Sequence, residues 1–191
     1  MDVPFTGRPT SAAAQAVLTF WFEDTKPYQW FRRSAQFDQT VRTRFGAMHE
    51  AACSGRLDVW QSNPHHCLAL IIVLDQFSRN TYRDTPRAFA QDKQALAIAN
   101  GAIRRRYDQL FDRKEKAFFY MPFMHSEVLA VQEKSVALYK ARLPGTMNVP
   151  YAIEHRDIVK KFGRFPHRNK IMGRQSTPTE TAFLKAGGFN P

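Results

Sequence analysis

The spacing of apolar residues constrains the fold of this chain more than any other feature. Phe37, Val41, Phe45 and Met48 follow one another at steps of four, four and three residues. Residues at this spacing lie on one face of an α-helix, whereas a half-buried strand alternates apolar and polar residues. Because the chain has almost no alternating run, we predict an all-α fold.

Helix-start signals divide the chain into about seven helical segments with short polar joints. Asn63 and Pro64 form an N-cap and first-turn pair, and they precede the most apolar run of the chain, Cys67 to Leu74. We expect the helix that contains this run to be the most buried. Thr177 and Glu180 have the spacing of a capping box, which predicts a last short helix.

Glycine and proline mark the expected helix ends. The helix that begins near Pro86 is predicted to stop at Asn100 and Gly101, where the sequence offers a typical C-terminal signal. Pro122 is expected to end or kink its helix, because proline lacks the amide that a helix interior needs. A new helix is then predicted from about Ser126 to Leu143.

Short joints favour antiparallel helix pairs, and 191 residues are enough to build one core. We therefore predict a single domain over residues 1–191, with an ordered core from about 11 to 189. The two cysteines lack a redox or metal-binding spacing, and neither a signal peptide nor an apolar run of membrane-spanning length is present. These features predict a cytoplasmic protein that does not enter the membrane.

The chain carries a formal net charge of +11, with 28 basic against 17 acidic residues. A surface of this kind attracts anions at physiological pH. The excess fits either a functional anion site or a solvated, solubilising shell.

Three segments carry more hydrogen-bonding side chains than packing requires. The first follows the most apolar helix and contains Asp75, Gln76, Arg79 and Asn80. Arg79 lies four residues after Asp75, so the two side chains can pair on one helix face and favour the end of the helix. That structural interpretation competes with a role in ligand binding.

The second segment follows Pro122 and contains His125, Ser126 and Glu127. Ser126 and Glu127 suit the first turn of a helix. Alternatively, His125 and Glu127 face a cleft as proton donor and acceptor, because imidazole titrates near neutrality and a carboxylate can orient it.

The third segment, from Glu154 to Glu180, has seven basic side chains against three acidic ones, a net charge of +4. The basic residues are Arg156, Lys160, Lys161, Arg164, Arg168, Lys170 and Arg174. Guanidinium groups bind carboxylate and phosphate in a bidentate manner. The alternative is a lattice of internal ion pairs with acidic residues from other helices.

Several classes of function have no motif in this sequence. The residues that a metal site would need are His125, Glu127, His155 and His167, and their spacing matches no zinc signature. We therefore expect no metal and no cofactor, and find no nucleotide-binding loop or nucleophile elbow. A run of basic residues between 104 and 116 lacks any nucleic-acid-binding signature, so we interpret it as a solvated face and do not expect the protein to bind nucleic acid.

Five motifs carry a family resemblance: FWFED, QWFRRSAQFD, LALIIVLDQFSRN, YMPFMHSE and FGRFPHRNKIMGRQSTPTE. Together they make the chain resemble, from Val17 to Phe189, the bacterial family known as domain of unknown function nine-two-four. The resemblance implies an all-helical, tetratricopeptide-like right-handed superhelix, and it implies no established activity. Where this family often reads LDQFPRN, the chain has Ser78.

The resemblance transfers the polar motif positions of the family to this chain. They fall on Asp75, Gln76, Arg79, Asn80, His125, Ser126, Glu127, His155, Arg164, His167, Arg168, Asn169 and Arg174. These positions coincide with the three segments chosen on physical grounds.

Three functions of different classes follow from these residues. The leading hypothesis is a binding module in which Arg79, Glu127, Arg164, Arg168 and Arg174 hold an anionic small molecule or an acidic peptide end. The remaining predicted ligand-binding residues are Asp75, Gln76, Asn80, Ser126, His167 and Asn169. The second hypothesis is an acid-base hydrolase or isomerase with His125, Glu127 and His155 as catalytic residues. The third is a structural scaffold in which the charged clusters are internal ion pairs.

Overall fold

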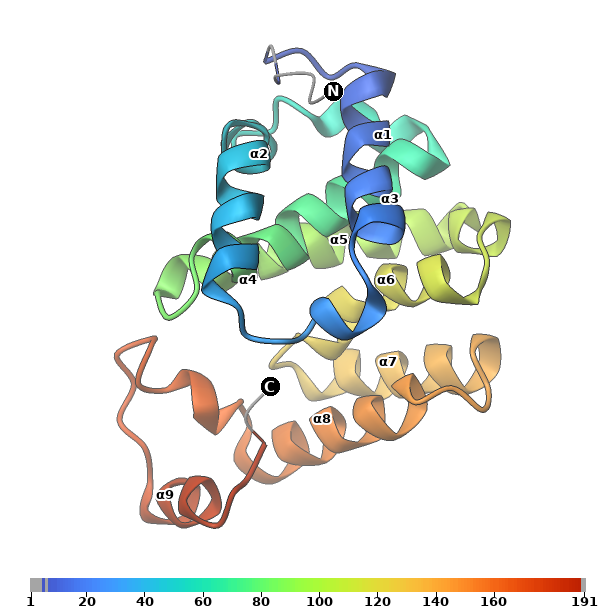
Figure 1. Ribbon diagram of the computed structural model, residues 1–191. Coiled ribbons are helices and arrows are strands. Elements are labelled where there is room, and N and C mark those ends of the chain that lie inside the picture. Colours follow the sequence, from blue (N-terminus) through green and yellow to red (C-terminus); the bar gives the residue numbers. More distant parts are fainter. Residues whose placement is uncertain (1–4, 6, 190–191) are drawn as a thin grey trace. The chain divides into compact units, whose positions relative to one another are not determined.

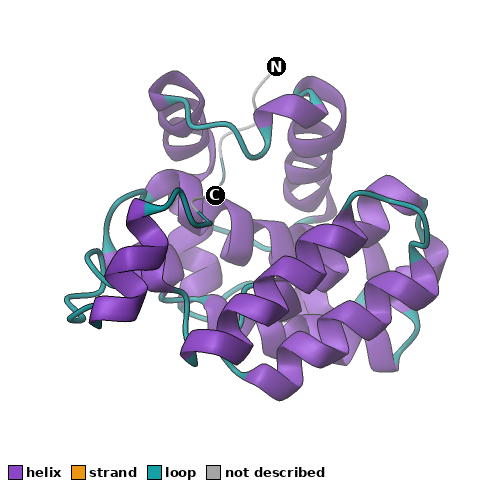
Figure 2. Cartoon of the chain, turned by 90° about the horizontal axis from the view of Figure 1, so that it is seen from below, coloured by secondary structure: helices purple, strands orange, loops and turns teal. Residues whose placement is uncertain are grey.

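The computed structural model describes residue 5 and residues 7–189. All regular secondary structure in this part of the chain is helical, as Figure 2 shows. The predicted all-α fold is therefore confirmed, while the tetratricopeptide-like superhelix stays a prediction. The chain divides into two compact units: unit 1 comprises Met1–Arg83 and Arg87–Pro122, and unit 2 comprises Asp84–Pro86 and Phe123–Pro191.

Unit 1 is built around α3, as the apolar run predicted. Every residue from Cys67 to Leu74 is at most 1% exposed. Helices α1 and α5 both pack against α3. The helices of unit 1 are α1 Ser11–Thr19, α2 Ala35–Cys53, α3 Pro64–Ile72, α4 Ser78–Thr81, α5 Asp92–Arg104 and α6 Arg113–Met124, which continues into unit 2 after Pro122 (Figure 1).

The two predicted helix caps are present, and α2 has a side-chain cap as well. The Asn63 side chain accepts hydrogen bonds from the first amides of α3, and Ser34 caps α2 through the amide of Phe37. Thr177 and Glu180 form the predicted capping box. These caps satisfy amides that have no partner inside the helix.

The beginning and the end of α5 differ from the prediction. Pro86 opens only a short 3₁₀ turn, Pro86–Phe89, and α5 begins at Asp92. The helix also continues through Gly101 to Arg104, because Ala102 and Ile103 are buried on its inner face. Burial of these side chains outweighs the local preference of glycine for a helix end.

Helix α6 and two π-helical turns also depart from the prediction. Helix α6 continues through Pro122 to Met124, and the neighbouring Met121 and Phe123 are buried. Loss of one backbone hydrogen bond at proline is thus offset by packing. The π-helical turns are Phe20–Asp24, which directly follows α1, and Val73–Phe77, which extends α3.

Unit 2 contains a helix pair and a shorter third helix. These helices are α7 Leu129–Arg142, α8 Asn148–Phe162 and α9 Pro178–Lys185. Helices α7 and α8 pack side by side (Figure 1). Helix α7 begins three residues later than predicted, because Ser126 Oγ accepts a hydrogen bond from the Val128 amide and holds a turn there. Gly163, with a φ of 72°, ends α8.

The core of unit 2 lies where α8 and α9 meet the loop that connects them. Ile158, Val159 and Phe165 are buried there, and Phe183 and Phe189 pack against them. None of the described helices combines the length and apolar character that a bilayer-spanning segment requires.

Candidate functional site

The first predicted polar segment forms a buried ion-pair network in unit 1. Arg79 NH1 lies 3.3 Å from Asp75 Oδ1 and 3.0 Å from Asp92 Oδ1. Burial disfavours the charge of Arg79, but the two carboxylates outweigh this effect and raise its pKa. Gln76 Nε2 donates to Asp75 Oδ2 over 2.6 Å. The predicted contact between Asp75 and Arg79 is therefore present, together with a third partner, Asp92, that sequence spacing does not indicate.

The residues on either side of Arg79 attach α4 to α2. Asn80 Nδ2 donates to Asp38 Oδ1 over 2.8 Å. The Ser78 hydroxyl donates to Leu74 O, so the hydrogen bond of 2.7 Å between His49 Nε2 and Ser78 Oγ has the imidazole as its donor. Proline has no hydroxyl, so this link depends on the serine that distinguishes the chain from the LDQFPRN pattern.

In unit 2, Glu127 is held by the loop that follows α8. Arg174 donates to both carboxylate oxygens of Glu127 over 2.7 and 2.9 Å, and the Phe165 amide donates to Glu127 Oε1 over 2.8 Å. Burial raises the pKa of Glu127, but these hydrogen bonds outweigh burial and leave the pKa below its usual value. Glu127 is therefore an anion that fixes the loop.

A second bidentate ion pair fixes the same loop to α9. Arg164 Nε and NH2 donate to the two oxygens of Glu180 over 2.7 and 2.8 Å. Asn169 Nδ2 and the Thr177 amide also donate to Glu180 Oε2. The hydrogen bond from Arg164 lowers the pKa of Glu180 against the effect of burial, and with the Thr177 and Asn169 bonds it brings the pKa to about 2.

Three imidazoles gather around aromatic rings in unit 2. The His125 and His155 ring centroids lie 6.4 Å apart. The rings of His155 and His167 both contact Phe165, at 5.6 and 5.5 Å, and both contact Phe189, at 4.5 and 5.5 Å. We call His125, His155 and His167 the imidazole cluster.

The tautomer of His155 is set by a hydrogen bond within its own helix. His155 Nδ1 lies 2.7 Å from Tyr151 O, and a carbonyl oxygen only accepts, so Nδ1 carries the proton. In the neutral ring, Nε2 is then the basic nitrogen. His155 is buried, whereas His125 and His167 are half-buried.

Arg168 adds a buried positive charge beside the imidazole cluster. Its guanidinium carbon lies 4.6 Å from the centroid of the Phe165 ring, and its charge lowers the pKa of Glu127 as a smaller contribution after those named above. Three arginines of this loop, 164, 168 and 174, thus face two carboxylates, Glu127 and Glu180. These side chains therefore have a net positive charge even when the imidazoles of the cluster are neutral.

The arrangement can be compared with known proteins. The model of the family described as bacterial protein of unknown function DUF924 matches residues 17–188. The chain belongs to the DUF924 family. A solved structure of a protein of unknown function from Agrobacterium tumefaciens is similar to it, with 41% sequence identity, a TM-score of 0.89, and coverage of 93% of this chain and 99% of that one. No curated protein matches the chain.

The structure places the predicted site residues of this DUF924 protein in two groups. The first group belongs to unit 1 and contains Asp75, Gln76, Arg79 and Asn80. The second belongs to unit 2 and contains His125, Ser126, Glu127, His155, Arg164, His167, Arg168, Asn169 and Arg174. The sequence indicated Glu180 only as a helix cap and did not indicate Phe189. Both residues contact side chains that lie far from them in the sequence. Helical spacing therefore did not indicate these contacts.

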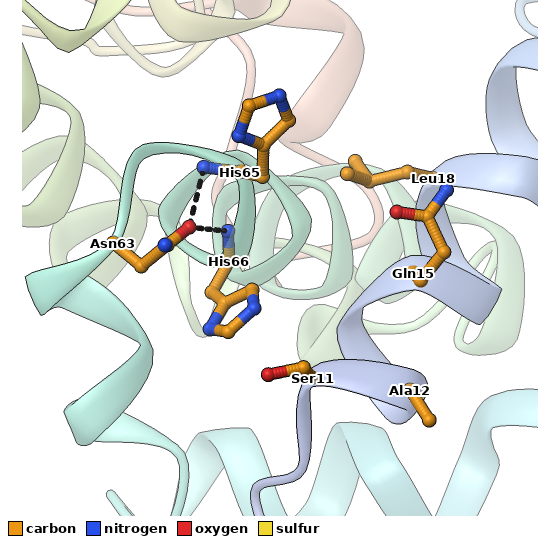
Figure 3. A pocket seen from close by; sticks show the side chains of 7 residues that line it. All are labelled: Ser11, Ala12, Gln15, Leu18, Asn63, His65 and His66. Carbon is orange, nitrogen blue, oxygen red and sulfur yellow. Dashed lines mark hydrogen bonds between the residues drawn. The ribbon is translucent and has the colours of Figure 1, made fainter.

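Unit 1 of the DUF924 protein also has an open pocket of about 470 Å³ between the starts of α1 and α3 (Figure 3). His65 and His66 line it, beside Gln15 and Ser11. Asn63 Oδ1 already accepts hydrogen bonds from the amides of both histidines, as the dashed lines in Figure 3 show. No group of three or more potential metal ligands occurs among the described residues.

Proposed function

We propose that unit 2 of this DUF924 protein binds an anionic small molecule or the acidic end of a peptide at the imidazole cluster and Arg168. The charge balance of the loop carries this proposal. Glu127 and Glu180 each accept a bidentate pair of hydrogen bonds from Arg174 and Arg164. Arg164, Arg168 and Arg174 thus give this loop three positive charges against these two carboxylates.

The proposal assigns different tasks to the basic residues. Arg164 and Arg174 position the loop through their ion pairs, and Arg79 has the same structural task in unit 1. Arg168 supplies the charge for the ligand. His125 and His167, which are half-buried, add hydrogen-bond donors.

Thermal unfolding with added inorganic phosphate and with succinate tests the proposal. Either anion is expected to raise the Tm of the wild type, and Arg168→Gln should remove this increase. Lys170→Gln is the matched control, because Lys170 is an exposed cation of the same loop and should leave the increase intact. An Arg168→Gln variant that folds and responds like the wild type would contradict the proposal. If neither anion nor an acidic peptide raises the Tm, the ion pairs are a scaffold.

One observation favours a second candidate, an acid-base hydrolase or isomerase. The bond to Tyr151 O fixes the His155 tautomer with Nε2 as the basic nitrogen, and His125 is its imidazole neighbour. In this candidate Glu127 acts by holding the loop. A panel of simple esters and phosphoesters should then show a bell-shaped pH profile that His125→Ala abolishes.

A cytoplasmic setting accords with both candidates. Cys53 and Cys67 are free thiols. Burial raises the pKa of Cys53 to about 11 and that of Cys67 to about 12, so both are protonated at neutral pH.

A further inference from the structure

Two large aromatic side chains of unit 1 point into solvent. Tyr28 is 68% exposed and Phe31 is 62% exposed. Both belong to the short segment between the π-helical turn Phe20–Asp24 and α2. Exposed rings only three residues apart in the sequence are unfavourable in water, and apolar surface of this kind is typical of interaction sites.

The exposed rings stand on a rigid base. Trp30 lies between them in sequence, and its ring stacks on Trp21 with centroids 6.1 Å apart and an interplanar angle of 17°. Trp30 Nε1 donates to Trp21 O over 2.8 Å, and Phe118 of α6 packs edge-on against the same indole at 5.0 Å. The Phe31 ring contacts Trp30 at 6.2 Å. Its position is therefore supported by the core.

Three cations flank these rings in the sequence, and a fourth lies beside Trp30. Lys26, Arg32 and Arg33 are exposed, and residues 26–34 include no acidic side chain. From α6, Lys114 Nζ lies 5.3 Å from the Trp30 centroid and donates to Phe22 O. The nearby Asp24 lies 3.6 Å from Arg44. We call Lys26, Tyr28, Phe31, Arg32, Arg33 and Lys114 the aromatic-basic patch.

We infer that the aromatic-basic patch binds single-stranded nucleic acid. Bases stack on exposed aromatic rings, and lysine and arginine side chains contact the phosphates between them. The patch offers two exposed rings for stacking and four cations for phosphate contacts within one short segment and the adjoining helix. Within the patch, only Lys114 belongs to the basic run between residues 104 and 116, for which the sequence predicted a solvated face without nucleic-acid binding.

The number of rings favours a nucleic acid over a membrane. Two aromatic side chains bury less apolar surface than one myristoyl chain, which by itself gives only marginal membrane binding. Binding of a nucleic-acid strand, in contrast, requires only one aromatic ring for each base that stacks. The inference is independent of the anion site proposed in unit 2, because it rests on other residues and another probe.

Fluorescence anisotropy with a labelled twelve-nucleotide oligo-dT at about 0.15 M salt tests the inference. Tyr28→Ala and Phe31→Ala should each weaken binding about tenfold without changing the charge of the protein. Both side chains are exposed, so the variants should keep the far-UV spectrum and the Tm of the wild type. Arg32→Ala should reduce the slope of log K against log salt by about 0.7.

Matched variants separate a specific patch from general attraction to a protein of charge +11. Tyr151→Ala removes an exposed tyrosine of α8, and Lys185→Ala removes a cation of α9, and neither should change the affinity more than about twofold. The inference is overturned if the oligonucleotide does not bind, or if the Tyr28 and Phe31 variants bind it like the wild type. It is also overturned if these variants lose binding to phosphatidylserine vesicles instead, which would identify the patch as a membrane surface.

Discussion

At the residue scale, Glu180 is the carboxylate whose charge matters most for folding. Its side chain is 2% exposed and forms an ion pair with the Arg164 guanidinium. Folding lowers its pKa from 4.5 to about 2, so the folded state favours the ionised form. The resulting stability is fully present above pH 4.5 and is lost as the pH falls toward 2.

Glu180→Gln should therefore lower the free energy of unfolding by about 2 kcal/mol at pH 7, because the charge-assisted hydrogen bonds are lost. The difference from the wild type should narrow below pH 4.5. Urea unfolding at a series of pH values measures both quantities. Glu154→Gln is the control, since Glu154 is exposed on α8 and should give only a small difference.

His49 shifts stability over a different pH range. It is 2% exposed, and burial lowers its pKa below 6.5, with a smaller opposing effect of Glu50 and a further lowering by Arg87. The folded state therefore favours the neutral ring, and this contribution is present above pH 6.5 and is lost as the pH falls through the folded-state pKa.

His49→Gln is expected to cost about 1 kcal/mol at pH 7, where the hydrogen bond to Ser78 is weakened. The variant should also lose less stability than the wild type between pH 7 and pH 5. Chemical unfolding at both values tests this. His65→Gln, on the exposed first turn of α3, should retain the wild-type pH dependence, and an unchanged dependence in His49→Gln would contradict the prediction.

At the scale of elements, two glycines should respond oppositely to alanine. A Cβ at Gly188 would lie 2.5 Å from Phe183 O and 2.7 Å from its ring, whereas a Cβ at Gly46, inside α2, would meet nothing within 4 Å. Gly188→Ala should therefore destabilise unit 2 by about 1–3 kcal/mol and displace the Phe189 ring from His155. Gly46→Ala should stabilise the protein by about 0.5–1 kcal/mol.

Thermal unfolding of both variants, with the NMR shift of the His155 ring proton as a local probe, measures these effects. The shift should change in Gly188→Ala and stay constant in Gly46→Ala, because only the first variant moves an aromatic ring beside the imidazole. A Gly188→Ala variant with unchanged Tm and unchanged shift would mean that Phe183 moves aside at no cost.

The sequence predicted helix starts better than helix interiors and ends. Asn63 and Thr177 were correct as caps, because a cap depends on residues one to three positions away. The continuation of α5 past Gly101 and of α6 past Pro122 was not predicted, since it depends on burial against other helices. The two π-helical turns have the same origin in tertiary packing.

The candidate sites show the same dependence on distance along the chain. The Asp75 and Arg79 pair followed from a spacing of four residues. The partner of Glu127 did not, because Arg174 lies 47 residues away. The excess of arginine and histidine in the sequence was sufficient to select the candidate residues of unit 2. Only the fold shows that Arg164 and Arg174 form ion pairs.

At the scale of the whole molecule, the three tryptophans allow the two units to be observed separately. Trp21, Trp30 and Trp60 all belong to unit 1, and the first and last are at most 1% exposed. Their fluorescence therefore reports the unfolding of unit 1 alone. Far-UV ellipticity instead sums the helices of both units.

We propose that the two units unfold together as the single domain that the sequence predicts. Urea transitions followed by tryptophan fluorescence and by ellipticity should then coincide. Glu180→Gln lies in unit 2, yet it should lower the midpoint of the tryptophan transition as much as that of the ellipticity. If the tryptophan transition stays fixed while the ellipticity splits into two steps, the units are separate domains, because a destabilised unit 2 then unfolds without affecting unit 1.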